Sequence, residues 1–228
     1  MLAYQYIKLL KGEIQLETIT IALPKGKLFA QSRELLEKAG YGAPGLSEDS
    51  RKLVIKNEAA GLSFVITKPM DLPTYVEYGA ADIGIIGKDV LLEEQKDIYE
   101  LLDLGFGKCR LMLAVPAGLR RSKLTDYANL RVATKYPRVA AEFFHGIGIQ
   151  AEIIYLNGSI ELAPMVGLSE MIVDIVETGR TLRENKLDEI AVIHAATARL
   201  IANRASFKLK FARIHSILGA MRRQLPSG

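Results

Sequence analysis

The chain has 228 residues, of which 49% are hydrophobic and 25% are charged, and its formal net charge is +4 at pH 7. This composition excludes wholesale disorder and provides enough apolar side chains for one large α/β domain or two small ones. No apolar run approaches the ~18 residues of a membrane-spanning helix, and the single cysteine, Cys109, excludes an internal disulfide and a metal site built from several cysteines.

The N-terminal segment 1–17 lacks the features of a signal peptide. It has no long apolar core and no small-residue cleavage site, and it carries Glu13 and Glu17. These features fit a cytoplasmic protein. The apolar residues of segment 1–16 also predict an extra amphipathic helix in front of the first strand.

Short runs rich in β-branched residues alternate with helical patterns along the chain. The expected strands are 18–23, 52–56, 62–67, 82–86, 109–115, 130–134, 152–156 and 171–176. The expected helices are 28–39, 71–78, 139–144, 160–166 and 181–185. Such alternation is typical of parallel sheets covered by helices, so it predicts the α/β class.

Segments 73–92 and 163–182 share one layout: a helix, a glycine, a strand, a second glycine and another helix. Their residues align poorly, but the layout indicates two similar α/β lobes with mainly parallel sheets and a cleft between them. Crossovers near 105–108 and 185–189 would give a lobe I of 1–107 plus 187–228 and a lobe II of 108–186. Small-molecule sites favour such clefts and the carboxyl ends of parallel strands.

The last 30 residues contain seven cations and no acid, which gives this segment a charge of +7 and leaves −3 for the rest. Apolar residues recur here at steps of three and four, as on one face of a helix. They are Phe207, Phe211, Ile214, Leu218, Met221 and Leu225. Either this stripe docks on the core or on a subunit, with a solvated basic face, or the basic face binds an anionic partner. The charges have no interleaved aromatic residues, which argues against single-stranded nucleic acid.

The segment 171–182, MIVDIVETGRTL, is the most informative part of the chain. An apolar strand carries Asp174 in its middle and then opens into a glycine-containing loop that starts a helix. The loop consists of Glu177, Thr178, Gly179, Arg180 and Thr181. Backbone amides, hydroxyls and an arginine suit a phosphate monoester, and the upstream acid is placed to accept from two ribose hydroxyls. The alternative is an ordinary turn with a threonine cap and a buried aspartate bonded to nearby amides.

A second candidate, Lys25-Gly26-Lys27, follows the first strand and opens the first helix. Lysines around a glycine at a helix N-terminus form a natural anion site, although the P-loop spacing is missing. A solvated basic turn is the alternative. The three histidines are far apart in sequence and have no metal-like spacing.

Six segments together resemble a known family. They are LPKGKL, DLPTYVEYGAADIGIIGKDVLLE, LLDLGFGKCRLMLAVP, LRVATKYP, LNGSIELAPMVGLSEMIVDIVETGRTLREN and ARLIANRASFK. In this order, over residues 18–210, they resemble the catalytic subunit of ATP phosphoribosyltransferase, the first enzyme of histidine biosynthesis. The length resembles the short form of the family, which works with a separate regulatory subunit similar to a histidyl-tRNA synthetase.

The resemblance implies that the chain transfers the 5-phosphoribosyl group of phosphoribosyl pyrophosphate (PRPP) to N1 of the adenine of ATP. It implies that loop 177–181 binds the 5-phosphate and that Asp174 binds the ribose hydroxyls, with Glu161 near the ribose. The implied catalytic residues are Arg51 and Lys27. The implied ATP or pyrophosphate contacts are Lys25, Gly26 and Lys68. Lys27 and Lys68 stand where the family usually has arginine, which keeps the charge but loses the bidentate fork.

The resemblance also implies Mg²⁺ bound with PRPP, a regulatory subunit and a homodimer within a hetero-oligomer, with neither nucleic acid nor membrane as a partner. Two alternatives remain at this point. One is a non-catalytic two-lobed binding protein of the periplasmic-binding-protein type II plan, which the implied fold also resembles. The other is a phosphoribosyltransferase for another base, although those of the common type carry two adjacent acids before the loop, and here Ile175 follows Asp174.

Overall fold

The computed structural model describes residues 17–50, 52 and 54–226. The expected N-terminal helix over 1–16 lies outside these residues. The chain forms two compact units. Unit 1 contains the described residues up to Ile86, then Lys96–Leu104 and the described residues from Arg199 onward, and unit 2 contains Gly87–Gln95 and Gly105–Ala198. None of the described helices has the length and hydropathy needed to cross a membrane.

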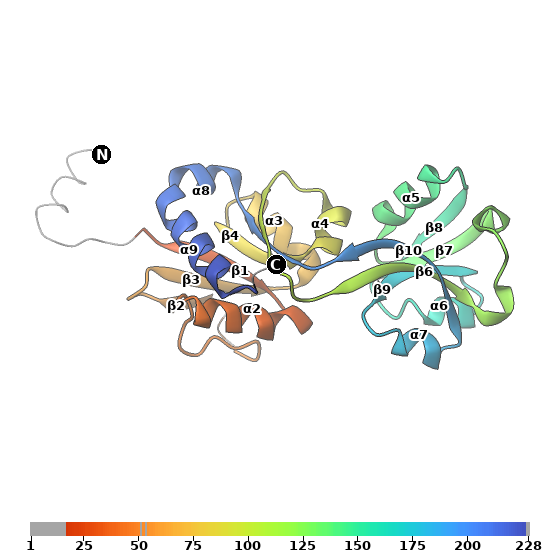
Figure 1. The fold of residues 1–228 in the computed structure, drawn as a ribbon, viewed down its shortest axis with the longest axis horizontal. Helices are drawn as coiled ribbons and strands as arrows, with labels where there is room; N and C mark the ends of the chain where they lie inside the picture. Colours follow the sequence, from red (N-terminus) through yellow and green to blue (C-terminus); the bar gives the residue numbers. More distant parts are fainter. Residues whose placement is uncertain (1–16, 51, 53, 227–228) are drawn as a thin grey trace, which may run out of the picture. The chain divides into compact units, whose positions relative to one another are not determined.

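Unit 1 is built on a six-stranded sheet with the order β2-β3-β1-β4-β11-β5 (Figure 1). Its strands are β1 (Ile19–Pro24), β2 (Val54–Asn57), β3 (Leu62–Thr67), β4 (Ile83–Gly87), β5 (Tyr99–Asp103) and β11 (Ala198–Ala202). Its helices are α2 (Lys27–Lys38), α3 (Leu72–Glu77), α8 (Arg204–Leu209) and α9 (Phe211–Gln224), with a 3₁₀ turn at Pro69–Asp71. Strand β1 pairs in parallel with β3 and β4, whereas β2 and β5 add antiparallel pairs to β3 and β11.

The C-terminal helices are fastened to unit 1 by a buried carboxylate. Asp82 accepts hydrogen bonds from the Thr20 amide at 2.8 Å, from the Ser206 hydroxyl at 2.6 Å and from the Lys210 ammonium at 2.9 Å. Asn203 caps α8 by accepting from the Ser206 amide at 2.8 Å. A buried charge requires such partners, so these contacts favour one position for α8 and α9 on the sheet.

The apolar stripe predicted over 207–225 docks on the core of its own unit. Ile214, Leu218 and Met221 are buried, whereas Phe211 remains 51% exposed. The stripe was one of two surfaces expected for a homodimer, and most of it is covered within unit 1. The other expected surface, the N-terminal helix, lies outside the described residues, so the homodimer stays a prediction.

Unit 2 contains a five-stranded sheet with the order β10-β6-β9-β7-β8. Its strands are β6 (Cys109–Pro116), β7 (Leu130–Thr134), β8 (Ala151–Tyr155), β9 (Met171–Val176) and β10 (Leu187–Ala196). Its helices are α4 (Lys88–Glu94), α5 (Pro137–Gly146), α6 (Leu162–Met165) and α7 (Arg180–Glu184), with 3₁₀ turns at Ala117–Leu119 and Leu124–Tyr127. Strands β8, β7 and β9 are parallel, and β6 and β10 continue the sheet in antiparallel pairing.

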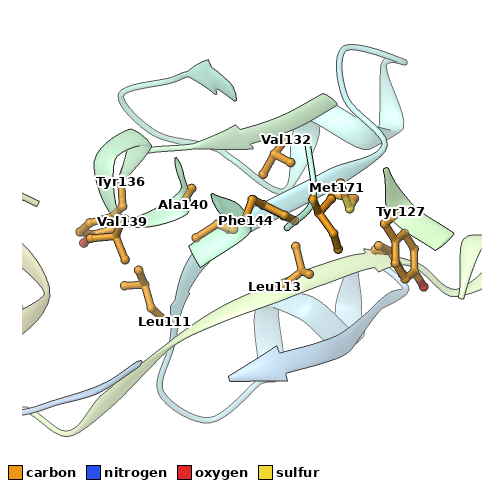
Figure 2. Close-up of a cluster of buried hydrophobic side chains, with 12 residues drawn as sticks. Leu111, Leu113, Tyr127, Val132, Tyr136, Val139, Ala140, Phe144 and Met171 are labelled. Atoms are coloured by element: carbon orange, nitrogen blue, oxygen red, sulfur yellow. The ribbon is translucent and has the colours of Figure 1, made fainter. Parts of the chain in front are cut away.

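Alternation along β9 divides the core of unit 2 between the two faces of its sheet. Met171 and Val173 join the cluster under α5, which includes Val139 and Phe144 (Figure 2). Ile172 and Val176 point to the opposite face and join the cluster that contains residues of the α6 and α7 segments. Successive side chains of a strand point to opposite faces. Asp174, between Ile172 and Val176 in this alternation, therefore belongs to the α6 and α7 face.

Helix α4 belongs to unit 2 although it directly follows β4. Its buried Glu93 accepts hydrogen bonds from the Arg138 and Val139 amides, both at 3.0 Å. These amides lie in the first turn of α5, where helical N–H groups have no intrahelical acceptor and a carboxylate is favourable. Glu93 thus caps α5 from a different helix.

The α/β class and two lobes are confirmed, and thirteen of the expected elements correspond to observed ones within a few residues. The sheets are mixed rather than mainly parallel. The unit boundaries also differ from the expected lobe limits: unit 2 extends to Ala198, beyond the expected limit at 186, because β10 pairs with β6. Strands β5, β10 and β11 were not expected, since each depends on pairing with a distant segment.

The ion pair between Arg131 and Glu170 gives a test of the packing of β7 against β9. Glu170 accepts from the Arg131 backbone amide at 2.8 Å and from its Nε at 3.2 Å. Hydrogen bonding to the Arg131 side chain lowers the pKa of Glu170 to about 2. The folded pKa is depressed, so the stabilisation is full above the unfolded pKa of about 4.3 and is lost as pH falls through the folded value.

We expect Arg131→Met to lower the free energy of unfolding at pH 7 only slightly, because the pair is partly exposed and screened by water. The melting temperature should fall by about 1–4 °C. Thermal unfolding at pH 7, 5 and 3 should show this difference shrinking below pH 5. Lys38→Met, which removes an exposed pair with Glu34 in unit 1, is the matched control. A difference that is independent of pH would contradict the role of the Glu170 charge.

Candidate active site

The loop after β9 begins the α7 helix through a left-handed glycine. Gly179 has a φ of +73° and a ψ of 6° and occupies the N-cap position of α7. A Cβ at this position would lie 3.0 Å from Arg183 Nη1 and 3.0 Å from Glu189 Oε1. Both the backbone angle and the lack of space therefore favour glycine here.

This loop offers backbone donors to an anion. Among the described residues, the amides of Thr178, Gly179, Arg180 and Thr181 have no acceptor. The side chains of Thr178 and Thr181 are exposed, so their hydroxyls are accessible. Several convergent N–H and O–H groups are what a phosphate monoester requires. Arg180 is exposed and forms an ion pair with Glu184 at 2.7 Å, so its charge lies at the solvent-exposed side of the loop.

Asp174 lies three residues before the loop on the same strand. It is half-buried, and its Oδ1 accepts from the Ile175 amide at 2.8 Å. A carboxylate on the α7 face of β9, next to a candidate phosphate-binding loop, suits the two hydroxyls of a ribose 5-phosphate. Glu161 occupies the N-cap position of α6, after the carboxyl end of β8. Strands β8 and β9 run parallel, with β7 between them, so they end at the same edge of the sheet. Asp174 lies near the end of β9, and Glu161 follows the end of β8.

The second group of expected residues lies at the carboxyl edge of the unit 1 sheet. Strands β1 and β3 pair in parallel up to Pro24 and Thr67, and the Lys25 amide donates to the Thr67 carbonyl at 2.8 Å. Lys25, Gly26 and Lys27 follow β1, and Lys68 follows β3, so the structure brings these four residues to one edge. All four are exposed. Arg51 lies outside the described residues.

The turn at Gly26 is built like an anion site but has an internal carboxylate beside it. Gly26 has a φ of +87° and precedes the first turn of α2. Its amide donates to Glu48 Oε1 at 2.6 Å. A phosphate that used this amide would have to displace Glu48. The remaining amides of the first turn of α2 and the lysines are therefore the more available donors to a phosphate.

Sequence reasoning did not assign a role to the buried pair Asp89 and Tyr136. The Tyr136 hydroxyl donates to Asp89 Oδ2 at 2.9 Å, and the Tyr136 amide donates to Thr134 Oγ1 at 2.9 Å. Burial raises the pKa of Asp89 above its usual range. Burial, followed by the charge of Asp89 and then that of Asp174, raises the pKa of Tyr136. Tyr136 therefore stays protonated beside Asp89, after the carboxyl end of β7. The only sequence feature that could have pointed to this pair is the run Thr-Lys-Tyr-Pro over 134–137, at the end of the strand.

The described residues contain no cluster of three or more histidine, cysteine, aspartate or glutamate side chains suited to a metal. An all-protein metal cage is therefore missing from the part of the chain that the structure describes.

Comparison with known proteins decides the family. The family model for HisG, ATP phosphoribosyltransferase, matches residues 68–223. An ATP phosphoribosyltransferase of Caldanaerobacter subterraneus subsp. tengcongensis is 53% identical over 213 residues, which cover 93% of this chain and 100% of the relative. This chain belongs to the ATP phosphoribosyltransferase family. The relative from Desulfitobacterium hafniense is 54% identical over 91% of this chain and 96% of its own.

Solved structures place the fold in the same family. The ATP phosphoribosyltransferase of the HisG:HisZ complex from Thermotoga maritima has a TM-score of 0.79 and 33% identity, with 90% of this chain and 98% of that chain covered. A substrate-binding protein of an amino acid ABC transporter has a TM-score of 0.59 at 12% identity, over 90% and 92% of the two chains. At that identity the likeness concerns the fold alone, and it confirms the expected resemblance to binding proteins.

The phosphate loop of this ATP phosphoribosyltransferase family member generates a binding prediction. Thr178→Ala removes a hydroxyl donor to a charged group, which is worth roughly 1.5–3 kcal/mol, so PRPP should bind about 10- to 150-fold more weakly. Thr125→Ala, an exposed threonine in a 3₁₀ turn of the same unit, is the matched control and should bind PRPP normally. Gly179→Ala should weaken PRPP as well, because alanine is strained at a φ of +73°.

Calorimetric titration of PRPP in the presence of Mg²⁺ measures all three variants. Gly118→Ala controls for the glycine substitution, since Gly118 has open space around its α-carbon and no positive φ. Normal PRPP affinity in both Thr178→Ala and Gly179→Ala would move the phosphate site away from this loop.

Proposed function

We propose that this chain transfers the 5-phosphoribosyl group of PRPP to N1 of the adenine of ATP, releasing pyrophosphate and forming N1-(5-phosphoribosyl)-ATP. This is the first step of histidine biosynthesis. Membership of the ATP phosphoribosyltransferase family over most of the chain is the observation that carries the proposal. We place the reaction in the cytoplasm, in keeping with a biosynthetic enzyme.

At the PRPP end, the chain works by positioning. The amides of 178–181 and the two threonine hydroxyls hold the 5-phosphate, and Asp174 accepts from the ribose hydroxyls, with Glu161 nearby. Fixing both ends of the ribose leaves C1 as the part of the sugar that moves during the reaction. Such positioning lowers the entropic cost of bringing C1 and the attacking nitrogen together.

At the leaving-group end, cations stabilise charge that grows during bond cleavage. The transition state resembles an oxocarbenium ion, and negative charge accumulates on pyrophosphate as the C1–O bond breaks. Lys25, Lys27 and Lys68 are exposed cations at one sheet edge that suit the pyrophosphate or ATP phosphates, together with Arg51. No general base is required, because N1 of neutral adenine carries no proton. This chemistry accounts for a site rich in cations and amides rather than histidine or cysteine.

Mg²⁺ would enter with PRPP and neutralise part of the diphosphate charge. The described residues contain no group of three or more metal-ligating side chains, and a cation bound mainly by the substrate needs few protein ligands. The protein's own contribution at this point is the lysine charge and the α2 amides.

The two other functions considered from the sequence are weaker. The likeness to a substrate-binding protein of an amino acid ABC transporter is at 12% identity and supports a shared fold only. A phosphoribosyltransferase for another base would have a different family signature, whereas the curated relatives at about 50% identity are ATP phosphoribosyltransferases.

We expect the purified chain with ATP, PRPP and Mg²⁺ to produce phosphoribosyl-ATP, measured by its absorbance and by release of pyrophosphate. Lys27→Met should lower kcat more than it raises the KM for ATP, because its interaction strengthens as the pyrophosphate leaves. Lys27→Arg should retain activity or improve it. Lys38→Met, at the other end of α2, is the control. Pyrophosphate released only with free adenine or another base as acceptor would contradict the proposed acceptor.

We further propose that a separate regulatory subunit carries the histidine response. The Thermotoga maritima relative was solved as a HisG:HisZ complex, which supports a partner of the HisZ type. A homodimer of this chain within the hetero-oligomer is part of the same proposal.

The regulatory proposal predicts that histidine leaves the activity of the isolated chain unchanged and inhibits only after a HisZ-type subunit is added. Coupling between two binding sites is reciprocal, so substrate binding should then alter histidine affinity by the same factor. Light scattering with and without the partner gives the assembly. Inhibition of the isolated chain by histidine would contradict the need for a second subunit.

A further inference from the structure

We propose that Arg183 is a positioning residue for the phosphate loop. It holds the Thr178 carbonyl and thereby aims the Gly179 amide at the phosphate. The proposal rests on the function proposed above, and it concerns a residue that touches the loop rather than the substrate.

The guanidinium of Arg183 makes its contact with the loop backbone. Arg183 Nη1 donates to the Thr178 carbonyl oxygen at 3.1 Å, and it lies 3.0 Å from the point that a Cβ on Gly179 would occupy. The side chain therefore lies over the peptide unit that joins Thr178 to Gly179. This contact reaches back from α7 to the loop that precedes it.

The direction of that peptide unit determines where the Gly179 amide points. In a trans peptide the C=O and N–H groups point in opposite directions, and none of the described peptide bonds is cis. Holding the carbonyl on the Arg183 side therefore turns the Gly179 N–H to the other side. Among the described residues this amide has no acceptor, which leaves it available to an anion.

Glycine permits this arrangement, and Glu189 borders it. Residue 179 needs a left-handed φ, and without Arg183 the flexible Thr178–Gly179 peptide can rotate at little steric cost. Glu189 Oε1 lies 3.0 Å from the same would-be Cβ position, and Arg110 neutralises Glu189 through contacts at 3.3 and 3.4 Å. Arg110 thereby offsets the charge of a carboxylate beside the loop that would otherwise repel a bound phosphate.

Arg183→Met tests the proposal because it keeps the length and apolar stem of the side chain and removes the donor. We expect the KM for PRPP to rise roughly 5- to 30-fold, which corresponds to one contact of ordinary strength. The KM for ATP, kcat and the melting temperature should stay near wild type, because the lost contact orients one amide. Arg183→Lys should restore most of the PRPP affinity, since its ammonium can donate to the same carbonyl.

Arg120→Met is the matched control, because it removes an exposed pair with Asp188, the neighbour of Glu189, without approaching the loop. Its KM for PRPP should equal that of wild type. An unchanged KM in Arg183→Met would overturn the proposal. So would a weaker dependence of PRPP affinity on salt in Arg183→Met than in Arg183→Lys, because that result would indicate a direct charge contact with the phosphate.

Calorimetry with PRPP separates this proposal from the function it rests on. If the wild-type chain binds PRPP but transfers nothing to ATP, the proposed function fails, and the comparison of Arg183→Met with Arg183→Lys still decides the role of Arg183. If wild type transfers phosphoribose and Arg183→Met binds PRPP normally, only the role of Arg183 is contradicted.

Discussion

The left-handed backbone at Gly179 is the constraint on which the proposed phosphate site depends. At a φ of +73° the chain turns from the end of β9 into α7 within three residues, and the amides of 178–181 in this turn have no acceptor among the described residues. A larger residue would be strained at this backbone angle and would also displace the side chains of Arg183 and Glu189. Residue 179 thus has a backbone conformation that favours glycine, and neighbouring side chains occupy the space that a Cβ would need.

The sheet of unit 2 holds this turn in place. Strand β9 lies between β6 and β7, and apolar side chains cover both of its faces. Asp174 interrupts that apolar strand on the α7 face, so the acid proposed to bind the ribose and the proposed phosphate loop share one support. The pair Asp89 and Tyr136 adds a buried polar contact between α4 and the end of β7. A site supported by strands and packed helices loses little of its geometry to thermal motion.

Local features of the sequence predicted the elements that local features determine. The alternation in 171–176, the glycine and the flanking threonines predicted β9, its loop and the start of α7, and the alternation of strands and helices predicted the α/β class. Strands β5, β10 and β11 escaped prediction because each is an antiparallel partner of a distant segment. The hydrogen bond from Tyr136 to Asp89 joins residues 47 positions apart, and that from Arg183 to the Thr178 carbonyl depends on loop geometry. Spacing along the chain specifies neither contact.

The position of the 5-phosphate tests the account most directly. A crystal structure of the chain with PRPP and Mg²⁺ would show which amides face that phosphate. We expect its oxygens against the amides of 178–181 and the ribose hydroxyls on Asp174. A 5-phosphate bound instead at the turn of Gly26, with loop 177–181 making no contact to PRPP, would contradict the account.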